Sequence, residues 1–271
     1  MKTEVIKLYE NREDVTLTTY VLEDSPEMLA GKSRPAILIC PGGGYMSCSD
    51  REAEPIAMKF ASMGYHTFVL RYSTYMGGNA GGFPDISKPL PVKEECLYPT
   101  QMREIGQAML IIREQAEEWK VDADRIAVCG FSAGAHLCGM YASTWHEGLL
   151  ADTFGVEKEV FKPLSALLMY GVLDYVIQDE FTASNQNPML PDDMNVPVMG
   201  AVRPSKEVLE KWSPICHVTK EMPPTFLGAA VDDGMVPSIQ SVKMAEKLHM
   251  AGVPYELHMF QYGDHGFSLG R

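Results

Sequence analysis

Long hydrophobic runs are missing from the sequence, and no stretch approaches the ~20 apolar residues of a membrane-spanning helix. Residues 1–7 also lack the apolar region of a secretory signal peptide. The 6 cysteines include no Cys-x-x-Cys pair, which excludes a zinc knuckle and a thioredoxin-type redox site. We therefore expect a cytoplasmic protein with free thiols and no membrane partner.

Basic residues are scarce compared with acidic ones. The 271 residues include 23 Lys and Arg but 36 Asp and Glu, which gives a formal net charge of -13. A surface of this sign repels phosphate backbones, so we expect no nucleic-acid partner. Hydrophobic residues make up 46% of the sequence, enough for a sizeable core. A homo-oligomer is compatible with this composition.

Short apolar runs alternate with helical patterns along most of the chain. Two N-terminal runs, at 5–8 and 15–21, resemble an antiparallel strand pair. The later runs are apolar on both faces and lie at 36–40, 67–70, 126–129, 166–170, 225–230 and 255–260. Amphipathic patterns at 51–63, 98–119, from 133, and at 238–250 predict helices. This alternation predicts an α/β fold with a mostly parallel central sheet and helices on both faces.

Finer signals concern helix starts and loops. Ser49 and Glu52 have the spacing of a capping box at the start of the first helix. Residues 73–99 and 173–204 break the alternation and are rich in Gly, Pro, Asn or Asp. Loops this long are usually functional or disordered. We expect residues 1–271 to form a single domain in which these two loops flank the active site.

The strongest motif is Gly130-Phe131-Ser132-Ala133-Gly134, a G-x-S-x-G between a predicted strand and a predicted helix. The turn is so tight that the residues two before and two after the serine must be tiny, as glycines are. Ser132 is then exposed at the helix N-terminus, where amide groups and the helix dipole favour negative charge. The motif predicts Ser132 as a nucleophile.

A serine nucleophile needs a base. His265 follows the last predicted strand, with Gly263 and Gly266 beside it, so its loop can reach a neighbouring strand end. The other histidines of the total of 7 fit less well. His136, one turn after the serine on the same helix, is expected to pack or form hydrogen bonds within that helix.

The base in turn needs a carboxylate that orients it and stabilises its protonated form. Asp232 and Asp233 both follow the run at 225–230, and Asp233 opens a turn into the next helix. We favour Asp233, while Asp232 and Asp174, which follows another strand, remain alternatives. The resulting order Ser, Asp, His is the one expected for an α/β-hydrolase.

A glycine turn (42–44) follows the first core run and is itself followed by Tyr45. The N–H group of Gly43 or Gly44 can join that of Ala133 in an oxyanion hole. No Lys-Ser/Thr follows and no G-x-G-x-x-G spacing is present, which excludes phosphate and dinucleotide loops. Tyr45 is expected to bind substrate, and Tyr72 and Tyr75 are expected to line the same pocket.

Together these motifs resemble the acetyl-esterase and acetyl-xylan-esterase-like branch of the α/β-hydrolases, also called lipase/esterase. The similarity runs over 36–266 and rests on Cys40-Pro41-Gly42-Gly43-Gly44-Tyr45, Arg51-Glu52-Ala53-Glu54-Pro55, Val69-Leu70-Arg71-Tyr72, Asp124-Arg125-Ile126, Gly130-Phe131-Ser132-Ala133-Gly134, Pro223-Pro224-Thr225-Phe226, Asp232-Asp233-Gly234-Met235-Val236-Pro237 and His265-Gly266. It implies the α/β-hydrolase fold and a serine carboxylic ester hydrolase for acetyl or other short-chain esters, such as acetylated sugars or xylo-oligosaccharides. It implies neither a metal nor a cofactor.

The sequence departs from the wider lipase/esterase pattern at three points. Pro41 stands where many relatives have His before the glycine triplet, and the Pro form is the one that this branch resembles. Ala135 replaces the more usual glycine after the motif and is expected to crowd the helix. The family also implies a C-terminal helix after His265, whereas the sequence ends at Arg271, so either that cover is absent or the chain continues. A feruloyl esterase, a dienelactone-type hydrolase, a peptidase and a non-catalytic binding protein remain as alternative functions.

Overall fold

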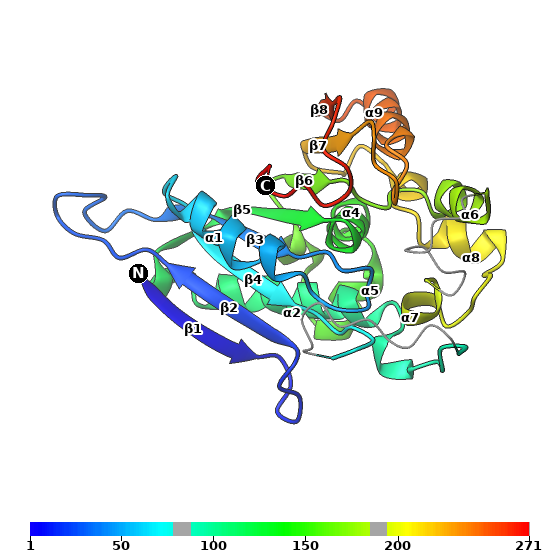
Figure 1. Ribbon diagram of the computed structural model, residues 1–271. Coiled ribbons are helices and arrows are strands. Elements are labelled where there is room, and N and C mark those ends of the chain that lie inside the picture. The colour runs from blue at the N-terminus through cyan, green and yellow to red at the C-terminus, as the bar shows by residue number, and fades with distance from the viewer. Residues whose placement is uncertain (78–87, 185–193, 271) are drawn as a thin grey trace.

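The computed structural model describes residues 1–77, 88–184 and 194–270, and these residues contain one eight-stranded sheet (Figure 1). Across the sheet the strands follow the order β1-β2-β4-β3-β5-β6-β7-β8. Their bounds are β1 Lys2–Lys7, β2 Thr16–Val21, β3 Arg34–Cys40, β4 His66–Arg71, β5 Val121–Phe131, β6 Ala166–Met169, β7 Thr225–Ala230 and β8 Tyr255–Phe260. β2 pairs antiparallel with β1 and β4, and the other pairs are parallel. The predicted sheet and its antiparallel N-terminal pair are confirmed.

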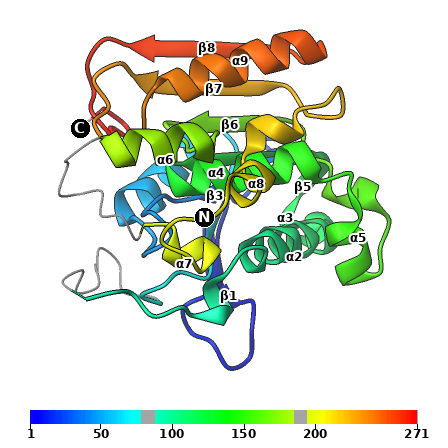
Figure 2. The same cartoon turned by 90° about the vertical axis from the view of Figure 1, so that its right-hand side faces the viewer.

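Helices connect the parallel strands. In the described residues their bounds are α1 Glu54–Ala61, α2 Thr100–Glu114, α3 Ala116–Trp119, α4 Ala133–Thr144, α5 Gly148–Phe154, α6 Tyr175–Ser184, α7 Val196–Met199, α8 Lys206–Lys211 and α9 Ile239–Ala251, with 3-10 helices η1 Asp50–Glu52, η2 Glu94–Cys96, η3 Lys158–Phe161 and η4 Pro214–His217. Figure 2 places α9 beside β7 and β8 at one end of the sheet. Within the part of the chain that is described, no helix combines the length and apolarity of a membrane span.

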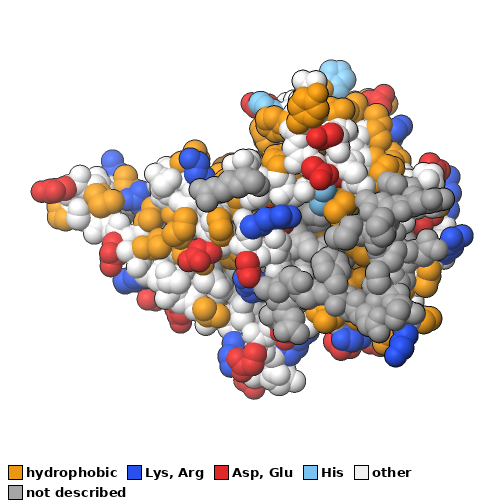
Figure 3. Space-filling view, viewed as in Figure 1, with side chains coloured by type: hydrophobic (Ala, Val, Ile, Leu, Met, Phe, Trp, Pro, Cys, Tyr) orange, Lys and Arg blue, Asp and Glu red, His pale blue; other side chains and the backbone are white. Residues whose placement is uncertain are grey.

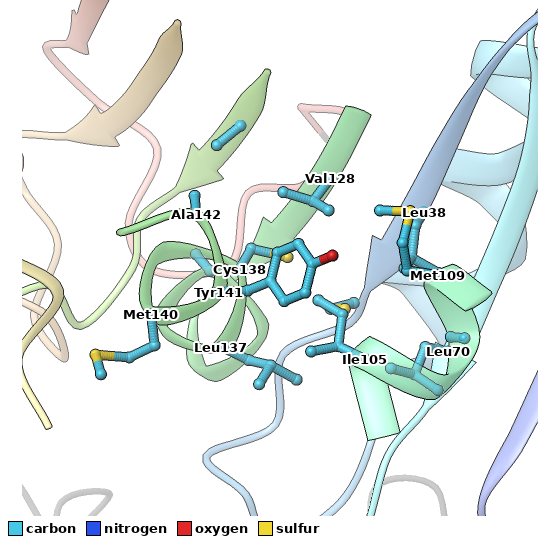
Figure 4. Packing of buried hydrophobic residues seen from close by; sticks show 14 of the residues in the cluster. Leu38, Leu70, Ile105, Met109, Val128, Leu137, Cys138, Met140, Tyr141 and Ala142 are labelled. Carbon is cyan, nitrogen blue, oxygen red and sulfur yellow. The ribbon is translucent and has the colours of Figure 1, made fainter. Parts of the chain in front are cut away.

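The core has two layers because successive side chains of a strand point to opposite faces of the sheet. Leu38 of β3 and Val128 of β5 pack on the side of α2 and α4, where Tyr141 lies against them (Figure 4). The next residue along β3, Ile39, packs instead in a second cluster with Ile56 of α1. Both faces of the sheet are thus covered by helices, as predicted.

Two helix predictions need correction. The helix predicted at 98–119 is divided into α2 and α3 at Gln115. The helix predicted at 51–63 begins with η1 and continues as α1, and the Ser49 side chain forms no cap hydrogen bond. Glu52 does not turn back to Ser49 because its carboxylate is buried against other parts of the chain. The capping-box prediction is therefore wrong.

The predicted loop at 173–204 contains helices. The Asp174 carboxylate accepts hydrogen bonds from the Val176 and Ile177 N–H groups at distances of 2.9 and 3.2 Å, which satisfies free donors at the start of α6. A second helix, α7, begins with a proline near its first position. Residues 78–87 and 185–193 of the two predicted loops lie outside the described residues. The assignment of the chain to one domain stays a prediction.

Candidate active site

Ser132 lies at the junction of β5 and α4 in a strained backbone conformation, with φ of 52° and ψ of -118°. Its N–H group donates a hydrogen bond of 2.9 Å to the Met169 carbonyl oxygen of the neighbouring strand. A Cβ atom on Gly130 would overlap the Gly134 carbonyl oxygen, and one on Gly134 would overlap the Cys40 carbonyl oxygen. The two glycines are therefore required by backbone contacts.

A chain of hydrogen bonds joins Ser132, His265 and Asp233. His265 Nε2 lies 2.8 Å from Ser132 Oγ, and its Nδ1 lies 2.8 Å from Asp233 Oδ2. An ionised carboxylate only accepts hydrogen bonds, so Nδ1 carries the proton and Nε2 is the free basic nitrogen. The Asp233 side chain is 0% exposed and that of His265 is 10% exposed, which shields both from bulk water.

The Asp233 carboxylate is held on both of its oxygens. Oδ2 bonds to His265, while Oδ1 accepts hydrogen bonds from the Met235 and Val236 N–H groups at 2.9 and 2.8 Å. These bonds come from the turn that leads toward α9. They fix the plane of the carboxylate, so that one oxygen faces the imidazole.

The two alternative acids bond elsewhere. Asp232 Oδ1 accepts a hydrogen bond of 2.9 Å from the Asp264 N–H group, and Asp174 binds the first N–H groups of α6. Asp264 Oδ1 in turn accepts from the His265 N–H group at 2.8 Å. Asp232 therefore helps to hold the backbone before His265 rather than its imidazole ring.

The backbone N–H groups of the predicted oxyanion hole lie beside Ser132. Gly43 and Gly44 have φ values of 126° and 62°, a conformation that favours glycine. Together with Ala133, they line the same cavity as Ser132 and His265. Among the described residues, the N–H groups of Gly43, Gly44 and Ala133 have no hydrogen-bond acceptor. They are therefore available to an oxygen of a bound ligand.

The cavity has a volume of about 560 Å³, within the range of small-molecule sites. Its walls include Tyr175 and Gln178 of α6, together with Met194 and Arg203. The segment predicted to flank the site at 173–204 thus contributes to it. No described residue of 73–99 lines the cavity.

The tyrosines predicted to line the pocket are mainly structural. Tyr72 and Tyr75 are buried and do not line the cavity; their hydroxyls donate to the carbonyl oxygens of Pro41 and Pro91. That part of the prediction is wrong. Tyr45 borders the cavity but is 2% exposed. Its role in substrate binding stays a prediction.

The Tyr45 side chain is held in place by His136. The Tyr45 hydroxyl lies 2.7 Å from His136 Nδ1, and His136 Nε2 lies 2.7 Å from the Trp212 carbonyl oxygen. Because a carbonyl only accepts, Nε2 carries the proton and Nδ1 accepts from the tyrosine. Burial lowers the pKa of His136 to about 4, so the ring is neutral at neutral pH. His136 is buried, so it packs as expected, but its hydrogen bonds run to segments outside its own helix, which corrects that half of the expectation.

The crowding expected from Ala135 is relieved by a second glycine. Ala135 is fully buried, and a Cβ atom on Gly171 would lie 2.7 Å from the Ala135 Cβ atom. Gly171 follows β6, next to the strand that carries Ser132. The methyl group of Ala135 therefore occupies space that Gly171 leaves empty.

Two residues for which no role in the active site was predicted also lie at the site. Tyr170 follows β6, and its ring meets the His265 ring edge-on with centroids 5.2 Å apart. Glu52 is buried and its carboxylate accepts a hydrogen bond from the Tyr170 hydroxyl at 2.8 Å. Glu52 belongs to the motif 51–55, on which the family resemblance partly rests, and this was the sequence signal that could have pointed to it. Among the described residues, no group of three or more His, Cys, Asp or Glu could hold a metal ion.

Residues 89–248, more than half of the chain, match the model of the BD-FAE family. The chain belongs to the BD-FAE family. Endo-1,4-beta-xylanase B of Butyrivibrio fibrisolvens is 27% identical over 241 residues, which cover 87% of this chain and 33% of that protein. The chain spans a third to about half the length of the curated relatives it matches.

Solved structures agree with this assignment. An acetyl ester-xyloside bifunctional hydrolase from Caldicellulosiruptor lactoaceticus is 26% identical with a TM-score of 0.74, covering 98% of this chain and 88% of that one. MGS-M1, an α/β-hydrolase enzyme from a Medee basin deep-sea metagenome library, is 30% identical with a TM-score of 0.69, covering 100% and 86%. This BD-FAE family member is therefore an esterase-like α/β-hydrolase, as the sequence motifs predicted.

Proposed function

We propose that the protein is a serine-dependent carboxylic ester hydrolase. The observation that carries this proposal is the chain of hydrogen bonds from Ser132 through His265 to Asp233. It lies in a cavity that can hold a small molecule, beside the Gly43 and Gly44 N–H groups, for which the described residues supply no acceptor. Membership of an esterase-like family supports the same reaction class.

The geometry supports a two-step acyl transfer. Ser132 Oγ attacks the ester carbonyl carbon while His265 Nε2 takes its proton, and the Asp233 carboxylate stabilises the imidazolium. The N–H groups of Gly43, Gly44 and Ala133 bind the oxyanion of the tetrahedral intermediate. His265 then protonates the leaving alcohol, and an acyl-enzyme remains on Ser132. Water, activated by the same nitrogen, releases the acid.

The substrates proposed are acetyl or other short-chain esters of sugars or xylo-oligosaccharides. Two similarities support this class: one to a hydrolase described as acting on acetyl esters and xylosides, and one to a xylanase. The cavity combines apolar and polar walls, through Val236 and Met194 on one hand and Gln178 and Asp179 on the other. No nucleic acid, membrane or cofactor takes part in the proposed reaction, and the cytoplasmic location stays a prediction.

The test is acetate release from acetylated xylo-oligosaccharides, with p-nitrophenyl acetate as a second substrate. We expect release from both, and a loss of kcat of ~10⁶-fold in Ser132→Ala. Ser62→Ala, an exposed serine after α1, is the matched control and should keep full activity. Release from p-nitrophenyl acetate alone would remove the sugar proposal and leave the esterase. Retention of about a tenth of the activity by Ser132→Ala would reject the serine mechanism.

A further inference from the structure

Glu52 is a buried carboxylate between two parts of the active site. It ends η1, and only 2% of its surface is exposed. Oε2 accepts a hydrogen bond of 2.8 Å from the Gly42 N–H group, at the start of the glycine turn. Oε1 accepts a hydrogen bond of 2.8 Å from the Tyr170 hydroxyl. Both oxygens of one side chain are thus bound to different segments of the chain.

Tyr170 continues this connection to the segment that carries His265 (261–270). Its hydroxyl oxygen accepts a hydrogen bond of 3.1 Å from the Ser268 N–H group. Its ring contacts the rings of His265 and Phe267, with centroid distances of 5.2 and 4.8 Å. A single tyrosine therefore holds both the ring of His265 and the backbone that follows it, and Glu52 holds that tyrosine.

The glycine turn is equally close to Glu52 and to Ser132. A Cβ atom on Gly42 would lie 2.7 Å from Glu52 Oε2 and 2.8 Å from Ser132 Cβ. Gly42 therefore has no space for a side chain between Glu52 and Ser132. Burial raises the pKa of Glu52, whereas the hydrogen bonds from Tyr170 and Gly42 lower it. The two hydrogen bonds therefore offset part of the cost of burying this carboxyl group.

We infer that Glu52 is a positioning residue, which holds the glycine turn and the His265 segment in a fixed relation to each other. The inference rests on the proposed ester hydrolase function. The oxyanion donors of the glycine turn and Nε2 of His265 must both face the same tetrahedral carbon. A displacement of ~1 Å in such a group can cost ~10²-fold in rate. Although Glu52 borders the cavity, its 2% exposure leaves almost no surface for substrate contact.

The experiment compares Glu52→Ala and Glu52→Gln with Glu54→Gln, a control at an exposed glutamate two residues away. The maximal rate with p-nitrophenyl acetate is divided by the number of sites that a fluorophosphonate labels, so that kcat excludes any unfolded fraction, and KM is taken from the same rate curves. We expect Glu52→Ala to lower kcat ~10²-fold, with KM changed by less than about threefold. Glu52→Gln keeps an acceptor for Gly42 and a polar group for Tyr170, so it should recover about tenfold of this loss.

Tyr170→Phe tests the link between Glu52 and the His265 segment. It takes the place of Glu52→Ala if Glu52→Ala does not fold. It removes one hydroxyl, and we expect kcat to fall about tenfold. In the double variant with Glu52→Gln, the two losses should not add, because both break the same connection. A kcat of Glu52→Ala within about threefold of wild type, or a change confined to KM, overturns the inference. Failure of the esterase proposal itself would give a different result, because the wild-type protein would then be inactive or the Ser132→Ala variant would be active.

Discussion

Ser132 and His265 lie within hydrogen-bond distance, yet the two regions that carry them differ in how they are held. Every residue of α4, which begins directly after Ser132, is buried. Residues 261–264, which lead to His265, are exposed. Hydrophobic side chains also gather on the surface over β7 and β8, where Val231, Phe260 and Tyr262 are exposed (Figure 3).

The difference shows two ways to fix a side chain of the proposed triad. Backbone atoms pack so closely against Gly130 and Gly134 that neither position has space for a side chain. This close packing fixes the position of Ser132 between them. The His265 segment is instead held by a few hydrogen bonds and ring contacts from Asp232, Asp233 and Tyr170. We expect changes near Ser132 to destroy the fold, and changes near His265 to reduce the activity of a protein that still folds.

Gly134→Ala should have the largest effect. The added Cβ atom overlaps the Cys40 carbonyl oxygen, which belongs to a central strand, so we expect no cooperative unfolding transition in urea. Gly139→Ala, in the same helix, is the matched control. Its Cβ atom first meets the Pro214 side chain at 3.1 Å, and we expect a loss of less than about 2 kcal/mol. Equal stability of the two variants would contradict the steric account.

Asp233→Asn should lower kcat by ~10⁴-fold while the protein stays folded, because an amide no longer selects the reactive tautomer of His265. The effect is measured as kcat for p-nitrophenyl acetate, alongside the thermal unfolding temperature. Asp174→Asn makes the same chemical change at the start of α6 and should leave kcat within about threefold of wild type. A similar loss of kcat in both variants would contradict the assignment of the orienting role to Asp233.

The smallest effect concerns pH and the buried His136. Its pKa is about 4 in the folded protein and 6.5 when unperturbed, so the unfolded chain binds the proton first as pH falls. The stability contributed by the neutral ring is therefore present above pH 6.5 and is lost toward pH 4, by ~3 kcal/mol. Urea unfolding at pH 7 and pH 4 should show this loss in wild type, beyond that in His136→Gln. Parallel losses in the two proteins would refute this assignment.

Patterns that depend on neighbouring residues were predictable from the sequence. The central strands are apolar on both faces because helices cover both faces of the sheet. The tight turn at Ser132 needs small residues at two fixed positions, and the sequence contains them. The fold and the positions of Ser132, Asp233 and His265 at strand ends followed from such local rules.

Contacts between distant segments were not predictable in the same way. Glu52 has the spacing of a capping residue, but its carboxylate bonds to Tyr170, which is 118 residues away. The composition of 173–204 favours a loop, yet α6 forms there because Asp174 caps its start and Tyr175 and Gln178 are buried. Nothing in the short-range pattern specifies these partners, because they meet only after the sheet has formed.

The arrangement of the cavity has a consequence for enzyme engineering. Much of one wall comes from the single segment that connects β6 and β7, through described residues such as Tyr175, Gln178, Met194 and Arg203. The proposed nucleophile, base and acid lie outside that segment. Substrate range can therefore diversify by exchange of one contiguous cassette between homologues, while the reaction chemistry is inherited unchanged.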